Sequence, residues 1–144
     1  MISSMHLIIR TDGGARGNPG PAGIGVVIED DKGKVLEEHA EYLGTTTNNQ
    51  AEYKAAILGL KRAVALGATS AEIVADSELL VKQAQGEYKV KNADLAHRYL
   101  ELKNLETQLN GHVKYRHVRR EYNTHADKLS NDAMDKGSGK KKSR

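Results

Sequence analysis

The chain has 144 residues, which is enough for one domain with a substantial core and too few for two. It has no cysteine, so disulfides and thiolate zinc sites are excluded, and no stretch approaches the roughly 20 apolar residues of a membrane span. The formal net charge of +3 comes from the last eight residues, GSGKKKSR, because the remainder holds 18 basic and 19 acidic residues. A polyanionic partner must therefore be held by a local basic patch or by this end of the chain, and not by an overall positive field.

The expected location and boundaries follow from the same features. The first residues, MISSMHLIIR, lack the charged start and long apolar core of a signal peptide, so we expect a soluble cytoplasmic protein with no membrane partner. We expect one domain over residues 1–136 and a disordered basic tail over residues 137–144, since the tail is too polar to pack.

Three β-like segments open the chain, at residues 6–12, 23–30 and 34–43. The first two are rich in Ile and Val and are bounded by glycines. The sequence DDKG at 30–33 is typical of a hairpin turn that leads into the third. We therefore expect three strands joined as antiparallel neighbours.

The apolar period then changes from that of a strand to that of a helix. Apolar residues recur at helical spacing from Tyr53 to Val64, with Thr47 or Asn48 as the N-cap and Gly67 at the end. Beyond Gly67 the sequence predicts, in order, a strand at 71–76, a helix capped by Ser77, a helix from Asn92 or Asp94 to about Leu109, a strand at 112–119 and a helix after Asn123.

This order of elements predicts an α/β fold with a five-stranded mixed sheet, three antiparallel strands followed by two parallel ones, flanked by helices. The first strand would be central, and the strand at 71–76 would lie parallel beside it. Ligands bind open sheets of this kind outside the carboxyl ends of the strands. Asp12 and Asp76 both end strands at that edge, which is the first functional signal.

Four acidic residues can converge on this edge of the sheet. Either strand-end aspartate, taken alone, would cap the next turn or helix more often than it would bind a ligand. Glu52 lies near the start of the first helix, beside its buried stripe, and Asp127 has the same placement in the last helix. Two acids at strand ends and two on inner helix edges can thus face one pocket.

Such a cluster requires compensation of its negative charge. Two like charges about 4 Å apart repel by on the order of 4 kcal/mol at an effective dielectric constant near 20. Either the pKa values of some carboxyl groups rise or cations bind. An all-oxygen site without cysteine suits Mg²⁺, with Mn²⁺ as the alternative. Two such ions can clamp the attacking and leaving oxygens of a phosphodiester displacement.

The four acids lie in the motifs TDGGARGNPGPAG, TTTNNQAE, IVADSELLV and HADKLSNDAM, which in this order and spacing resemble type 1 ribonuclease H. The resemblance covers nearly all of the chain from Leu7 to Met134 and marks residues 1–136 as a ribonuclease H catalytic domain with the ribonuclease H-like fold. It implies an endonuclease that cuts the RNA strand of RNA/DNA hybrids with a divalent metal and leaves 5′-phosphate and 3′-hydroxyl ends.

The resemblance also implies a catalytic role for each acid, with two metal ions when substrate is bound. Asp12 would bridge both ions. Asp127 would hold the ion that activates the water, and Glu52 and Asp76 would complete the other, which stabilises the departing 3′-oxygen.

Contacts to the hybrid are implied by the same motifs. Gly13, Gly14, Ala15 and Asn18 match the loop that approaches the RNA minor groove, where 2′-hydroxyl groups distinguish RNA from DNA. The residues that match contacts to the DNA phosphate, to base edges and to the backbone are Thr47, Asn48, Asn49, Gln50 and Asn92. N-capping of a helix accounts for Thr47 or Asn48 equally well.

The chain departs from the family pattern in two places, so it is a compact form. Many members carry a longer basic segment that grips the hybrid, whereas this chain has only GEYKVKN at 86–92, and we expect weaker or more salt-sensitive binding. The flexible loop with a glycine and a histidine before the last helix is also missing, because HVRREYNTHAD contains no glycine. The auxiliary candidates in its place are His125, His117, Arg119, Arg120 and Asn123.

We expect a monomer that acts on the RNA/DNA hybrid, with double-stranded RNA as an alternative substrate because a trimmed binding segment relaxes selectivity. A non-catalytic hybrid-binding module is a second class of function, but it would have little reason to keep all four acids. A phosphate-handling ATPase of related fold is disfavoured because 144 residues cannot supply its second domain.

Overall fold

Strand β1 (His6–Ala15) lies at the centre of a five-stranded sheet in the order β3-β2-β1-β4-β5. The structure is a computed structural model and describes residues 4–139. β2 (Gly20–Asp30) and β3 (Val35–Thr46) pair antiparallel with their neighbours, whereas β4 (Ser70–Ala75) and β5 (Val113–His117) pair in parallel. The mixed sheet, with its first strand central and β4 parallel beside it, confirms the fold predicted from the sequence.

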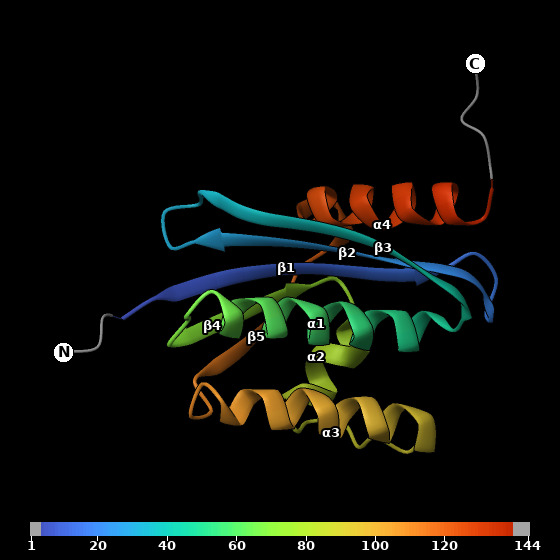
Figure 1. Ribbon diagram of the computed structural model, residues 1–144. Helices are drawn as coiled ribbons and strands as arrows, with labels where there is room; N and C mark the ends of the chain where they lie inside the picture. Colours follow the sequence, from blue (N-terminus) through green and yellow to red (C-terminus); the bar gives the residue numbers. More distant parts are fainter. Residues whose placement is uncertain (1–3, 140–144) are drawn as a thin grey trace.

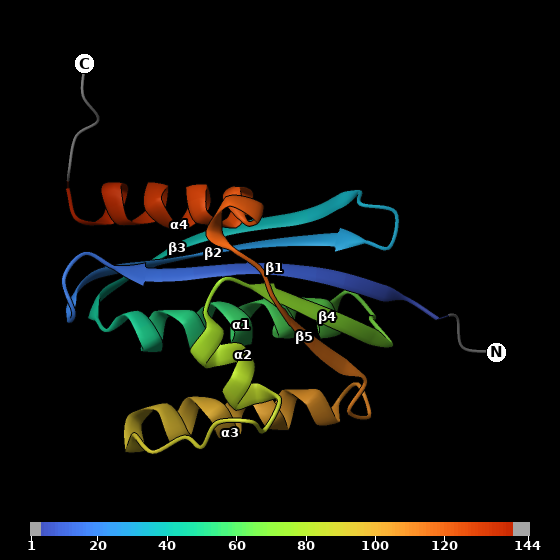
Figure 2. The same cartoon turned by 180° about the vertical axis from the view of Figure 1, so that it is seen from behind.

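Helices cover both faces of this sheet (Figure 1). α4 (Thr124–Gly137) lies on one face, while α1 (Asn48–Ala65), α2 (Glu78–Ala84) and α3 (Ala93–Thr107) gather on the other. Seen from behind, the short 3₁₀ turn η1 (Arg120–Tyr122) joins the end of β5 to the start of α4 (Figure 2). The connection from β5 to α4 therefore leaves the sheet beside the end of β4 and reaches the face that α4 covers.

The alternation of side chains along β1 decides what each helix meets. Ile9 and Thr11 face α1, where Gly59 allows the helix to lie against them. Asp12 pairs with Gly25 of β2, and a Cβ at Gly25 would overlap the backbone of α4. Asp12 therefore belongs to the face that α4 covers.

The predicted helix caps are present. Thr47 accepts a hydrogen bond from Gln50 N at 3.2 Å, Ser77 accepts one from Leu80 N at 3.2 Å, and Asn92 accepts one from Asp94 N at 2.9 Å. Each cap supplies an acceptor to a first-turn amide that has no partner within its helix.

The end of the first strand differs from the sequence prediction. β1 does not end at Asp12 but continues to Ala15, because the small residues of the following segment pair with the first half of β2. The parallel pairing of β1 with β4, however, stops at Thr11 opposite Ala75. Asp12 is thus the first residue of β1 beyond the end of β4, so it still lies at the predicted edge.

The predicted basic tail lies largely outside the part of the chain that the structure describes. α4 ends at Gly137, and residues 140–144 of the predicted basic tail lie outside the described residues. Between residues 4 and 139, none of the helices combines the length and the apolar character needed to cross a bilayer.

Candidate active site

Three carboxylates meet at the edge of the sheet where β4 ends. Asp12 comes from β1, Glu52 from α1, and Asp76 directly follows β4. One oxygen of each lies within 4.8 Å of the others. Residues separated by 64 positions in sequence thus converge on one point.

The backbone around Gly13 fixes Glu52 in this cluster. The amide of Gly13 donates to Glu52 Oε1 at 3.0 Å. A Cβ at Gly13 would overlap the carbonyl of Ala51, so the absence of a side chain lets the start of α1 lie directly on β1. This close contact brings Glu52 of α1 against the strand.

Asp76 contributes an oxygen that lacks a hydrogen-bond donor. Its side chain is only 6% exposed, and Oδ2 is buried without a hydrogen-bond partner among the described residues. The nearest cation is Arg120 of η1, whose Nε lies 3.6 Å from that oxygen. A buried carboxylate oxygen without a donor is costly unless a cation or another ligand satisfies it.

The fourth acid, Asp127, approaches from α4. It lies in the first turn of that helix and lines a cleft of about 370 Å³ together with Asp12, Glu52 and Arg120. Asn131, one turn later, donates its side-chain amide to Asp127 O at 2.9 Å and to Oδ1 at 3.3 Å. The cleft therefore has Asp12 and Glu52 on the sheet side and Asp127 on the side of α4.

Electrostatics in the cleft favours a bound cation. Burial, followed by the charges of Asp76 and Asp127, raises the pKa of Asp12 to about 7, although a hydrogen bond from Ser130 opposes the shift. Burial and the charges of Asp12 and Asp76 raise the pKa of Glu52 well above 4.5. The ionised carboxylates repel one another, and a divalent cation would remove that repulsion.

The donor set fits a hard cation. Within residues 4–139 the cluster offers carboxylate oxygens and no thiolate or imidazole, which is the preference of Mg²⁺ and Mn²⁺. Asp76 Oδ2, buried without a donor, is an oxygen that such an ion would satisfy. The residues present therefore fit a divalent metal, which Asp12, Glu52 and Asp76 would hold from one side and Asp127 from the other.

The residues predicted to contact substrate divide between two clefts. Gly13, Gly14, Ala15 and Asn48 line the cleft of the acids. A second cleft of about 690 Å³ opens between the starts of α1 and α3, and its lining includes Asn18, Thr47, Asn49, Gln50 and Asn92. Lys54 and Arg98 add positive charge there, and Arg98 Nε donates to Gln50 Oε1 at 3.1 Å.

Hydrogen bonds connect the two clefts. Asn48 Oδ1 accepts from Ala15 N at 2.7 Å, and Asn18 Oδ1 accepts from Asn48 N at 3.0 Å. These contacts join the loop after β1 to the start of α1. The polar side chains that are predicted to contact substrate thus also order the loop itself.

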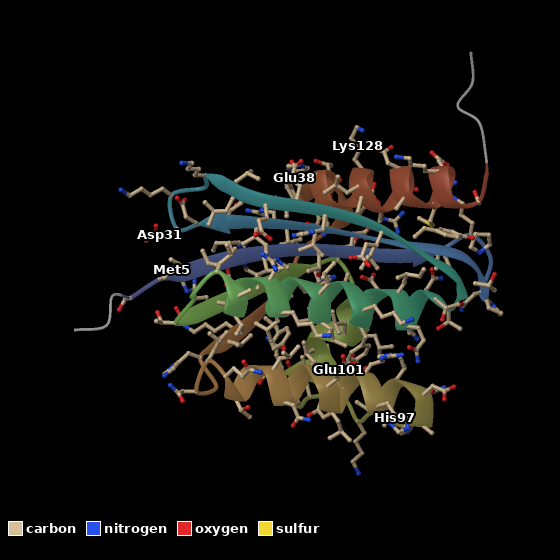
Figure 3. The ribbon with its side chains drawn as sticks, in the orientation of Figure 1. Met5, Asp31, Glu38, His97, Glu101 and Lys128 are labelled. Carbon is tan, nitrogen blue, oxygen red and sulfur yellow. The ribbon has the colours of Figure 1, made fainter. Side chains whose placement is uncertain are left out.

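Of the auxiliary candidates, the structure brings Arg120 to the acids. His125 instead lies 2.5 Å from Glu38 of β3, which Figure 3 shows beside the start of α4. Arg119 is 81% exposed and pairs with Glu121. Exposed His117 ends β5 and is not among the residues that line the cleft.

The last candidate, Asn123, is buried, and its side-chain amide donates to Thr11 O at 2.8 Å. It fastens the turn before α4 onto β1, next to Asp12.

Sequence reasoning missed the polar contacts that α4 makes to β1 and to the loop after it. The helical period predicts only that Ser130 faces inward, whereas its hydroxyl donates to Asp12 Oδ2. Arg16 pairs with Asp135 and donates to Asn131 Oδ1 at 3.2 Å. No local signal reveals such pairs, because the partners are more than 110 residues apart.

The comparisons with known proteins agree with this geometry. The family model described as "Reverse transcriptase-like" matches residues 10–133. "Ribonuclease H" of Erythrobacter litoralis is 33% identical over 88% of this chain and 94% of that protein. The chain belongs to the type 1 ribonuclease H family.

Solved structures of this family superpose closely on the chain. LC11-RNase H1, determined in complex with an RNA/DNA hybrid, is 46% identical with a TM-score of 0.88 over 92% of this chain and 99% of that one. The N-terminal RNase H domain of Rv2228c from Mycobacterium tuberculosis is 45% identical with a TM-score of 0.91 over 94% and 98%. The chain matches only 36% of the length of the full mycobacterial protein, which is called "Bifunctional protein Rv2228c" and is 48% identical over 91% of this chain.

Proposed function

We propose that this chain is an endoribonuclease that hydrolyses the RNA strand of RNA/DNA hybrids. The observation that carries the proposal is the meeting of Asp12, Glu52 and Asp76 within 4.8 Å, with Asp127 in the cleft beside them. A ribonuclease H1 with 46% identity was solved with such a hybrid bound, which supports the choice of substrate. The products are a 5′-phosphate and a 3′-hydroxyl end.

The proposal assigns Mg²⁺ as the metal, with Mn²⁺ as the alternative, and two ions when substrate is bound. When bound, they lower the pKa of the attacking water and stabilise charge on the departing 3′-oxygen. Asp12 would be shared between them, Asp127 would hold the ion on the side of the water, and Glu52 and Asp76 would hold the other.

The chain's own groups prepare these positions before substrate arrives. The Gly13 amide restrains Glu52 Oε1, and Asn131 restrains Asp127. Arg120 brings a positive charge beside Asp76, where we propose that it contacts the scissile phosphate.

The hybrid would extend from the cleft of the acids to the cleft between α1 and α3. Gly13, Gly14 and Ala15 would face the RNA strand, with Asn18 and Asn48 at the junction of the two clefts. Thr47, Asn49, Gln50 and Asn92 would contact the DNA strand. Lys54 and Arg98 supply phosphate-binding charge in that second cleft. The monomeric state and the cytoplasmic location stay predictions.

The test is cleavage of an end-labelled RNA/DNA hybrid with Mg²⁺, with Mn²⁺ and with chelator. We expect cutting of the RNA strand with either metal, 3′-hydroxyl ends that a polymerase extends, and no cutting with chelator. Asp12→Asn should reduce turnover to the chelator level while hybrid binding persists. Asp31→Asn, an exposed acid in the β2–β3 turn, is the matched control and should keep full activity.

Two further substrates separate the proposal from its alternatives. Double-stranded RNA and double-stranded DNA of the same sequence are offered under the same conditions. Failure to cut the hybrid with either metal would refute the proposal, and equal cutting of the DNA duplex would refute the substrate. Cleavage of double-stranded RNA in addition to the hybrid would show that the enzyme accepts both substrates.

A further inference from the structure

Ser130 is a fully buried polar side chain whose hydroxyl has two neighbours. It donates to Asp12 Oδ2, and it lies 2.9 Å from Asp127 O, the carbonyl one turn earlier in α4. A serine hydroxyl carries a single proton, and the carboxylate is the nearer and the charged acceptor. The donor is therefore committed to Asp12 and not to its own helix.

Packing does not require the hydroxyl at this position. The inward face of α4 otherwise presents Ala126, Ala133 and Met134, and it lies on Gly23 and Gly25 of β2. An alanine would fill the same place between sheet and helix, with a better helix propensity than serine. The hydroxyl group of Ser130 is therefore not needed for packing, and its hydrogen bond to Asp12 distinguishes it from an alanine at this position.

Asp12 is repelled by two neighbouring acids and needs a restraint from outside the cluster. Its side chain faces Asp76 and Asp127, both of which repel it. A carboxylate under such repulsion turns about its last side-chain bond unless a donor holds one oxygen. Ser130 is that donor, and it reaches Asp12 from the helix that also carries Asp127.

We propose that Ser130 is a positioning residue that holds the Asp12 carboxylate in the orientation required to bind the divalent cation. The proposal rests on the metal site of the proposed function. Ser130 does not touch the substrate or the cation in this assignment. It acts through Asp12, so its loss changes the affinity of the site for metal while the fold persists.

The deciding experiment compares Mg²⁺ binding by the wild type, Ser130→Ala and Ser130→Thr in the absence of substrate, by calorimetric or NMR titration. Partners that orient a metal ligand typically account for about 10- to 100-fold in affinity, so we expect a loss of about tenfold or more in Ser130→Ala. Ser130→Thr keeps the hydroxyl and should restore most of the affinity. Ser138→Ala removes an exposed hydroxyl from the far end of α4 and should bind Mg²⁺ as the wild type does.

Kinetics give a second reading that a purely structural role would not produce. With the hybrid as substrate, Ser130→Ala should require more Mg²⁺ for half-maximal rate, with KM for the hybrid unchanged at saturating Mg²⁺. In an Asp12→Asn background, Ser130→Ala should cause no further loss of Mg²⁺ binding.

Several outcomes would overturn the assignment. They are an unchanged Mg²⁺ affinity in folded Ser130→Ala, a threonine variant as weak as the alanine variant, or a wild type that binds no Mg²⁺. If the wild type binds Mg²⁺ with the expected dependence on Ser130 yet leaves the hybrid uncut, the proposed function fails and this inference stands.

Discussion

Asp12 is the residue in which structure and chemistry are most closely coupled. It is 6% exposed, and burial together with two acidic neighbours raises its pKa to about 7 from 3.8. Without a cation, the folded protein therefore keeps a proton on Asp12 that the unfolded chain releases above a pH of about 3.8. The contribution of Asp12 to the stability of the metal-free protein therefore falls as the pH rises from about 4 to about 7, because ionised Asp12 is tolerated better in the unfolded chain.

We predict that Mg²⁺ raises the melting temperature more at about pH 8 than at about pH 5.5, because protons compete with the metal for the carboxylates. Asp12→Asn should be more stable than the wild type in chelator at about pH 8, by on the order of 1–3 kcal/mol, and should gain little from Mg²⁺. Thermal melts at both pH values, with chelator or Mg²⁺, measure both effects. An equal gain at the two pH values would contradict the assignment of Asp12 as a ligand.

Gly13 shows how far single residues can be interpreted from the sequence. The acids were predictable, because charged side chains at strand ends and on inner helix edges contribute little to packing and are costly to bury without a ligand. The motif associates the glycines with the approach of RNA, yet Gly13 is required first by the contact of α1 with β1. Gly14 has no comparable constraint, since a Cβ there would meet only ordinary contacts. The difference depends on where α1 lies, and the local sequence does not encode that position.

At the scale of elements, the short connection between β5 and α4 determines which side chain reaches the acids. The Val118 amide bonds to Ala75 O at 3.0 Å, so the chain stays beside β4 after β5 has ended. Asn123 then ties the turn to β1. Between these two attachments η1 directs Arg120 toward Asp76 and Arg119 toward Glu121, although both side chains are largely exposed. The sequence predicted a compact connection and named both arginines, but the choice between them depends on the 3₁₀ turn.

We predict that Arg120→Ala lowers kcat/KM on the hybrid by about tenfold or more, because a positive charge beside the reacting phosphate is lost. Arg119→Ala removes the same charge from the neighbouring position and should leave kcat/KM within about twofold of the wild type. Steady-state rates of the two variants at the same salt concentration and at saturating Mg²⁺ give the comparison. Equal losses of kcat/KM in both variants would show that Arg120 acts only through general electrostatic attraction of the nucleic acid, and not through contact with the reacting phosphate.

At the scale of the whole molecule, the order and pairing of the strands were predictable, whereas the contacts between helix and sheet side chains were not. Apolar period, caps and turns mark each element, so the mixed sheet and its central strand follow from chain order and the right-handed crossover. The placement of α4 over Gly25 and Asp12, in contrast, depends on packing between residues about 100 positions apart along the chain. The site depends both on the order of the elements and on their packing, because its acids come from the sheet and from helices on both of its faces.

The central place of β1 has a consequence for amide hydrogen exchange. From Leu7 to Thr11, β1 lies between two paired strands, so the amides of this stretch should exchange only when the whole domain opens, whereas α4 can lift from its face of the sheet without breaking a strand pair. Asp12 directly follows this slowest-exchanging stretch, whereas Asp127 belongs to a faster-exchanging helix. A cation held by both would tie the two units together.

We predict that Mg²⁺ slows exchange in α4 more than in β1, measured by mass spectrometry or NMR at constant pH, and that Asp127→Asn abolishes the difference. Protection in α4 that is insensitive to Mg²⁺ would exclude a cation shared across the cleft. If Mg²⁺ does slow exchange in α4, the motion of this outer helix away from the sheet removes Asp127 from the metal site. That motion would occur on a timescale separate from the unfolding of the domain.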